Sequence, residues 1–226
     1  MKKQHRSNYL IVIALSLFVI SVFYAYHLYY PYIPAVSFDK SMEAGLKINF
    51  GTHDTPEEEK KWLEDLKYLY NHNCFNPKFL SKDYKIPPII HHIWLGSPIP
   101  DVYKQLRQTW VRNHPGWIFR LWTDADIENF NLENKHLYKL ARNYGEKSDI
   151  LRYELLKRYG GTYLDTDFMC VKSLEPIHKF NDFYAGIMNA GEVLIAIGVL
   201  GSVPNHQLIQ SVMSSIGQAG SKYDII

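Results

Sequence analysis

Residues 159–167 have the sequence YGGTYLDTD, and this stretch decides how the fold of the chain is interpreted. A double glycine interrupts the preceding segment, and the short run after it ends in Asp165 and Asp167. Because side chains alternate along an extended strand, the two carboxylates are expected to point the same way. Paired oxygen ligands at a strand end can hold Mg²⁺ or Mn²⁺, and such an ion also takes phosphate oxygens from a substrate. An isolated Asp-x-Asp is more often an Asp-rich turn, so the upstream sequence has to decide.

The upstream segment, residues 148–159, predicts a helix whose apolar residues recur at helical spacing. Ser148 can cap its N-terminus. Asp149 and Arg152 are three residues apart and therefore neighbours on one helical face. They can form a surface ion pair at the start of the helix. Because the double glycine folds the helix back onto the Asp-x-Asp strand, they can equally supply an acceptor and a donor for a polyhydroxylated ligand.

Three blocks occur in order along the chain: IPPIIHHIWLG at residues 86–96, HPGW to LWTD at residues 114–124, and SDILRY with YGGTYLDTD at residues 148–167. Together they closely resemble glycosyltransferase family 32, the sugar-transferring proteins with a DXD motif. Yeast Golgi mannosyltransferases and related bacterial enzymes belong there, and the catalytic domains of clostridial toxins are more distant relatives. The resemblance covers about residues 86–206, and three ordered blocks are far more specific than Asp-x-Asp alone.

The resemblance implies an α/β, GT-A-type nucleotide-sugar-binding domain that uses a UDP- or GDP-sugar as donor. By the same resemblance, Trp94 stacks on the donor nucleobase, and Asp149 and Arg152 hold hydroxyls of the transferred sugar. Tyr163 is expected to line the donor site. From the residues alone, Trp94 is equally a rim or core aromatic, and Tyr163 is equally a strand residue that faces the core.

The resemblance also implies roles for the carboxylate pair in metal-assisted sugar transfer. Asp165 is expected to contact the donor ribose or the metal shell, and Asp167 is expected to ligate Mn²⁺ or Mg²⁺ directly. The implied enzyme is a hexosyltransferase that moves a sugar to a glycan or glycolipid acceptor with retention of configuration. A phosphotransferase with Asp165 as nucleophile in Asp-x-Asp-x-Thr is disfavoured, because Met169 occupies the Thr position.

Strands and helices alternate after residue 86, which predicts a mostly parallel sheet with helices on both faces. Ligands of such sheets bind at the carboxyl ends of the strands, where Trp94 and the two aspartates fall. His91 and His92 follow an apolar run, so a hydrogen-bonded core histidine is favoured over a metal ligand. The expected strands are residues 89–94, 117–121, 183–187 and 193–200. The expected helices are residues 102–112, 135–142, 148–159 and 206–216.

The N-terminal region predicts a membrane anchor. Residues 9–30 contain no Asp, Glu, Lys or Arg and are long enough to span a bilayer, which takes roughly 20 residues. The basic tail at residues 1–8 places the N-terminus in the cytosol; a cleaved signal peptide is the alternative. We expect a single-pass protein of the Golgi if eukaryotic, or of the inner membrane if bacterial. Residues 31–54 are expected to form a stem, and residues 55–85 a helical lead-in.

The catalytic domain is assigned to residues 86–226, and since it ends before later elements of the family, a C-terminal part is expected to be missing. The expected alternative to an enzyme is therefore an inactive, truncated glycosyltransferase-like protein that binds ligand at the membrane. A length of 226 residues suits one domain with an appendage. The net charge of +2 gives no large basic field, which excludes nucleic acid as an expected partner.

Overall fold

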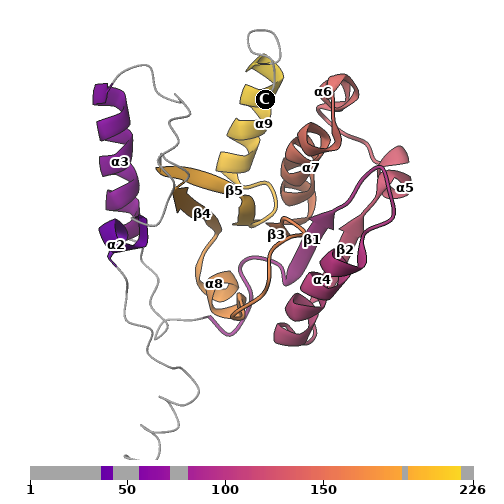
Figure 1. Cartoon of the computed structure of the whole chain (residues 1–226), viewed down its shortest axis with the longest axis horizontal. Helices are drawn as coiled ribbons and strands as arrows, with labels where there is room; N and C mark the ends of the chain where they lie inside the picture. The colour runs from indigo at the N-terminus through magenta and orange to yellow at the C-terminus, as the bar shows by residue number, and fades with distance from the viewer. Residues whose placement is uncertain (1–36, 43–55, 72–80, 190–192, 220–226) are drawn as a thin grey trace, which may run out of the picture. The chain divides into compact units, whose positions relative to one another are not determined.

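The computed structural model describes residues 37–42, 56–71, 81–189 and 193–219 (Figure 1). The predicted cytosolic tail and the predicted anchor at residues 9–30 lie outside these ranges. Among the helices within these ranges, none combines the length and the apolar character needed to cross a membrane. The chain divides into two compact units, residues 1–41 and 42–226, and helix α2 (Phe38–Met42) lies at their junction. Every feature discussed below belongs to the second unit.

The second unit is built on a five-stranded sheet with the order β2-β1-β3-β5-β4. The strands are β1 (Ile89–Ile93), β2 (Ile118–Trp122), β3 (Gly161–Leu164), β4 (Phe183–Asn189) and β5 (Val193–Ser202). Strand β1 pairs in parallel with β2 and β3, whereas β5 pairs antiparallel with both β3 and β4. The prediction of a mostly parallel sheet is therefore wrong for half of the pairings. A parallel pair needs a crossover of a dozen or more residues, and only residues 190–192 separate β4 from β5.

Helices cover both faces of this sheet, as the alternating pattern predicted. They are α3 (Pro56–Asn71), α4 (Asp101–Asn113), α5 (Asp124–Glu128), α6 (Lys135–Leu140), α7 (Tyr144–Tyr159), α8 (Glu175–Phe180) and α9 (Gln207–Ala219). Helices α7 and α9 lie on one side of the sheet, and α4 and α8 lie on the other (Figure 1). The eight elements predicted between residues 89 and 216 are all present, whereas α5 and α8 were not predicted. Helix α3 falls within the predicted helical lead-in.

Two buried apolar clusters hold the sheet between its helices. The α7 side of the sheet is packed by leucines of α7 and by residues of α9 and the strands, including Leu151, Leu155, Leu156, Ile209, Met213, Tyr163 and Leu200. The α4 side is packed by Ile90, Trp110, Trp117, Leu164 and Cys170. Each fully buried side chain of this size contributes about 1.5–3 kcal/mol from the water it loses. The clusters thus fix β1 and β3, whose carboxyl ends carry the predicted site residues.

The turn between α7 and β3 forms as the double glycine predicted. Gly160 and Gly161 have φ angles of 61° and 88°, which glycine adopts without steric cost. A methyl group on Gly161 would also lie 2.6 Å from the carbonyl oxygen of Ile89. His91 secures the turn, because its Nε2 donates to the Gly160 carbonyl at 2.9 Å while its Nδ1 accepts from Trp122 at 3.1 Å. The predicted core role of His91 is confirmed, and the turn brings α7 alongside the end of β3.

The start of α7 differs from the prediction. The helix begins at Tyr144, four residues before Ser148, and Asn143 is its N-cap. The Asn143 side chain accepts from the backbone nitrogen of Glu146 at 2.9 Å. Asn is as good a cap as Ser, and Asn143 followed three residues later by Glu146 is the signal that marks this start. The extra turn places Tyr144 and Gly145 at the carboxyl edge of the sheet.

Candidate functional site

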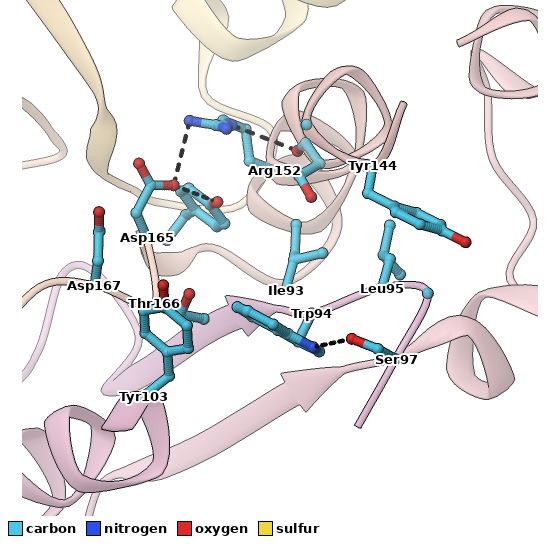
Figure 2. Close-up of a pocket in the computed structure, with 14 residues that line it drawn as sticks. Ile93, Trp94, Leu95, Ser97, Tyr103, Tyr144, Arg152, Asp165, Thr166 and Asp167 are labelled. Atoms are coloured by element: carbon cyan, nitrogen blue, oxygen red, sulfur yellow. Dashed lines mark hydrogen bonds and ion pairs between the residues drawn. The ribbon is translucent and has the colours of Figure 1, made fainter. Parts of the chain in front are cut away.

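A pocket of about 630 Å³ opens at the carboxyl ends of β1 and β3 (Figure 2). Four segments line it: the residues after β1, the first turn of α4, the first half of α7, and the turn after β3. Five of the six predicted site residues, all except Asp149, are in its wall: Trp94, Arg152, Tyr163, Asp165 and Asp167. Segments far apart in sequence therefore meet at one edge of the sheet, where ligands of α/β domains bind.

Asp165 and Asp167 lie in a turn and not in a strand. Strand β3 ends at Leu164, and the Phe168 nitrogen donates to the Asp165 carbonyl at 3.3 Å to close the turn. The prediction that both aspartates share one face of an extended strand is therefore wrong. The Asp165 nitrogen donates to the carbonyl of Gly198 on β5 at 2.9 Å, so a backbone hydrogen bond to the sheet holds the first residue of the turn.

The two carboxylates have different surroundings. Asp165 Oδ1 accepts from the Tyr163 hydroxyl at 2.6 Å and lies 3.8 Å from Arg152 Nη1. Asp167 is exposed, and its carboxylate makes no hydrogen bond or ion pair with the residues that the structure describes. Figure 2 shows the Asp167 side chain next to that of Asp165. Asp167 is therefore the carboxylate that is free to meet a ligand.

Arg152 is buried beneath the pocket, with only 5% of its side chain exposed. Its Nη1 donates to the carbonyl of Ile197 on β5 at 2.7 Å, and its Nη2 donates to Asp149. Its guanidinium also lies 4.5 Å from the centre of the Tyr163 ring, in a cation–π contact. Arg152 thus joins α7 to β5 through its donors and contacts β3 through the Tyr163 ring. The predicted contact of Arg152 with a sugar hydroxyl stays a prediction.

Asp149 lies outside the pocket wall, whereas Tyr163 is buried but lines the pocket. Burial raises the pKa of the Asp149 carboxyl, although the charge of Arg152 opposes this shift. Asp149 pairs with Arg152 and is not part of the pocket wall, so its predicted contact with the sugar stays a prediction. Burial also raises the pKa of Tyr163 far above its usual range. Tyr163 therefore keeps its proton at neutral pH and acts as a donor to Asp165.

Aromatic side chains form the opposite wall of the pocket. Trp94 is half-buried, its Nε1 donates to Ser97 Oγ at 3.2 Å, and its ring centre lies 4.9 Å from that of Tyr103 (Figure 2). Tyr144, with 52% of its surface exposed, adds a third ring at the start of α7. Gly96 makes room for this ring, because a methyl group there would lie 2.1 Å from it. Such a wall can stack on a planar base.

Sequence reasoning missed Tyr103 and Tyr144 as site residues. Tyr103 lies three residues after Pro100, the last residue of the Ser-Pro-Ile-Pro loop that leaves β1, which places it in the first turn of α4. Tyr144 follows the Asn143 cap, which places it at the first position of α7. The start of α4 was predicted to within one residue, so the place of Tyr103 could have been inferred, whereas Tyr144 was missed because the start of α7 was placed four residues too late.

The residues fit a cation that is shared with a substrate. Within the described part of the chain, no three His, Cys, Asp or Glu side chains gather closely enough to enclose a metal ion. Mg²⁺ is usually held by one or two carboxylates together with substrate phosphates and water, and not by a complete protein cage. Asp167 and the neighbouring Asp165 supply two such carboxylates.

The fold and the pocket together define an α/β domain whose site combines an aromatic wall, a buried arginine and a carboxylate pair. Residues 100–184 match the family described as "Glycosyltransferase sugar-binding region containing DXD motif". The resemblance to glycosyltransferases with a DXD motif is therefore confirmed over this region, which contains Arg152 and both aspartates.

Curated relatives agree with this match. The chain is 33% identical to mannosyl phosphorylinositol ceramide synthase CSH1 of Saccharomyces cerevisiae over 149 residues, which cover 64% of this chain and 39% of the relative. It is 28% identical to inositol phosphoceramide mannosyltransferase 2 of Schizosaccharomyces pombe over 148 residues, which cover 64% and 42%. The chain therefore spans about two fifths of the length of these relatives. Among solved structures, the PaToxG glycosyltransferase is 16% identical with a TM-score of 0.48, covering 74% of this chain and 70% of that one.

Proposed function

We propose that the pocket is the donor site of a hexosyltransferase that moves a sugar from a nucleotide-sugar to a glycolipid or glycan. The observation that carries this proposal is the meeting of Trp94, Arg152, Asp165 and Asp167 in one pocket at the carboxyl edge of the sheet. The names of the two yeast relatives add support for mannose as the sugar and inositol phosphoceramide as the acceptor. Retention of the anomeric configuration is part of the proposal.

In this proposal the aromatic wall and the acidic turn hold opposite ends of the donor. Trp94 and Tyr103 stack on the nucleobase, while Asp167 and Asp165 face the diphosphate through Mn²⁺ or Mg²⁺. When bound, the cation supplies positive charge that neutralises the leaving diphosphate. Arg152 and Tyr163 keep Asp165 in place, so the carboxylate does not have to reorganise when the donor arrives.

In this proposal the protein acts at a membrane. Residues 9–30 form a single-pass anchor, and the N-terminus lies in the cytosol. The length and apolar composition of this segment support the anchor. Alkaline extraction of membranes from expressing cells tests it. Release of the intact chain into the supernatant would contradict an integral anchor, and retention in the pellet would support it.

The donor site is tested by calorimetry on the full chain in detergent. We expect UDP or GDP to bind with Mn²⁺, the matching nucleotide-sugar to bind more tightly, and EDTA to abolish the gain from the metal. Release of free sugar, or transfer to inositol phosphoceramide, then reports turnover. Binding without turnover would favour the alternative of an inactive binding protein, and no binding of either nucleotide would refute the donor site.

A further inference from the structure

We infer that Gly198 of β5 is a positioning residue that sets the direction of the Asp165 carboxylate. The inference rests on the proposed donor site and extends it to a strand outside residues 100–184, the segment that matches the family. Gly198 is not part of the pocket wall, so its influence on the site passes through Asp165.

The space that a side chain on Gly198 would need is filled by Asp165. A methyl group at Gly198 would lie 2.5 Å from Asp165 Oδ2 and 3.3 Å from Cγ, whereas real Cβ atoms essentially never come closer than 3.0 Å to such a neighbour. The next neighbour, the edge of the Phe168 ring at 3.2 Å, belongs to a side chain that can shift. Gly198 has no positive φ, so the space, and not the backbone conformation, requires a glycine here.

The carboxylate is consequently fixed from three sides. Tyr163 donates to Oδ1 at 2.6 Å, Arg152 lies 3.8 Å from the same oxygen, and the bare backbone of Gly198 backs Oδ2. The neighbouring residue Ile197 holds Arg152 through its carbonyl at 2.7 Å. Two consecutive residues of β5 therefore position Arg152 and Asp165. A larger residue at position 198 would drive the carboxylate away and break its bond to Tyr163.

Gly186 provides a matched control on the neighbouring strand β4. A methyl group there would make a tight contact of 3.3 Å with Ala196 Cβ, its three nearest atoms belong to Ala196 and Val199 and not to the pocket wall, and Gly186 also lacks a positive φ. Gly186→Ala and Gly198→Ala thus make the same chemical change in paired strands and gain the same restriction of the unfolded chain. They differ in whether the added methyl group meets the Asp165 carboxylate.

The first test is a double-mutant cycle read by thermal unfolding of the full chain. We expect Gly198→Ala to lower the melting temperature by about 4 °C or more relative to Gly186→Ala, because overpacking is destabilising. In an Asp165→Ala background the methyl group has no carboxylate to displace, so Gly198→Ala should have little further effect. Equal lowering in both backgrounds would overturn the inference, because Gly198 would then act independently of Asp165.

The second test compares the affinity for UDP and GDP in Mn²⁺ with the affinity in EDTA. We expect Gly198→Ala to reduce this ratio about tenfold, toward that of Asp165→Ala, and Gly186→Ala to leave it within about twofold. A general loss of stability would lower the nucleotide affinities in Mn²⁺ and in EDTA alike and leave their ratio unchanged. An unchanged ratio in Gly198→Ala would overturn the inference. If the unaltered chain binds neither nucleotide, the proposed function fails, and the thermal cycle alone decides the role of Gly198.

Discussion

Replacing Arg152 with lysine keeps one positive charge but removes the guanidinium that joins α7 to β5 and contacts β3. The Arg152 guanidinium donates to Asp149 and, at 2.7 Å, to the Ile197 carbonyl, and it stacks 4.5 Å from the Tyr163 ring centre. A single lysine nitrogen cannot satisfy both the acceptor on its own helix and the carbonyl on β5. One of these two partly buried acceptors is left without a partner, which costs about 1–3 kcal/mol.

Loss of the stacked guanidinium adds about 0.5–1 kcal/mol. We therefore expect Arg152→Lys to lower the free energy of unfolding by about 1.5–4 kcal/mol. For a domain of this size each kcal/mol shifts the melting temperature by about 2–4 °C, so a drop of about 3–16 °C is expected. Asp149 and Asp165 are partly exposed, with 34% and 39% of their side chains accessible, and water limits the cost of disturbing them.

Thermal unfolding followed by circular dichroism measures this shift, with Arg120→Lys as control. Arg120 is exposed and lies 4.8 Å from the Trp122 ring centre, so it tests the loss of a stacked guanidinium without a buried acceptor. We expect the control to shift the melting temperature by about 2 °C or less. A shift for Arg152→Lys no larger than that of the control would refute the reasoning. Arg152 would then contribute little to the stability of the ligand-free fold.

Three further perturbations separate the other parts of the site. Asp167→Ala should abolish the Mn²⁺-dependent part of nucleotide affinity in calorimetry without lowering the melting temperature, because Asp167 is exposed; unchanged metal dependence would contradict its proposed role as ligand. Trp94→Ala should weaken UDP and its sugar conjugate equally, by about tenfold, since stacking on a base contributes about 1–3 kcal/mol; a loss confined to the conjugate would contradict stacking. Burial lowers the pKa of His91 and of His178 to about 4 from 6.5. Between pH 4 and pH 6.5 the unfolded chain therefore binds more protons than the folded chain. The stability that the two neutral histidines provide is complete above pH 6.5 and falls toward pH 4 by about 1.4 kcal/mol per pH unit for each histidine. A melting temperature equal at pH 7 and pH 5 would contradict this.

Local patterns were enough to predict most of the pocket. The double glycine at residues 160–161 requires a sharp turn, and this turn places Arg152 beside the end of β3. Trp94 lies just beyond a short apolar strand, so its place at the carboxyl edge followed from the strand itself. Each of these inferences needs only a few consecutive residues, which is why the sequence carried them.

The remaining features depend on contacts between distant segments. The carbonyl that holds Arg152 belongs to Ile197, 45 residues further along the chain. The glycine that admits the Asp165 carboxylate is the next residue, Gly198. Nothing in the local sequence of β5 distinguishes this glycine from one that merely interrupts a strand. The antiparallel direction of β5, by contrast, was predictable from the short connection that precedes it.

The arrangement of charges explains why Asp167 and Asp165 are suited to different tasks. Asp149 and Asp165 lie on either side of Arg152, so both share the charge of one guanidinium. Asp167 has no such partner among the described residues, and its negative charge faces the pocket. A diphosphate entering beside Asp167 would meet repulsion unless a divalent cation lay between them. The site therefore separates one carboxylate that is held by the protein from one that has no partner among the described residues, and this division follows from where Arg152 and β5 are placed. In the proposed function it is the second carboxylate that meets the cation.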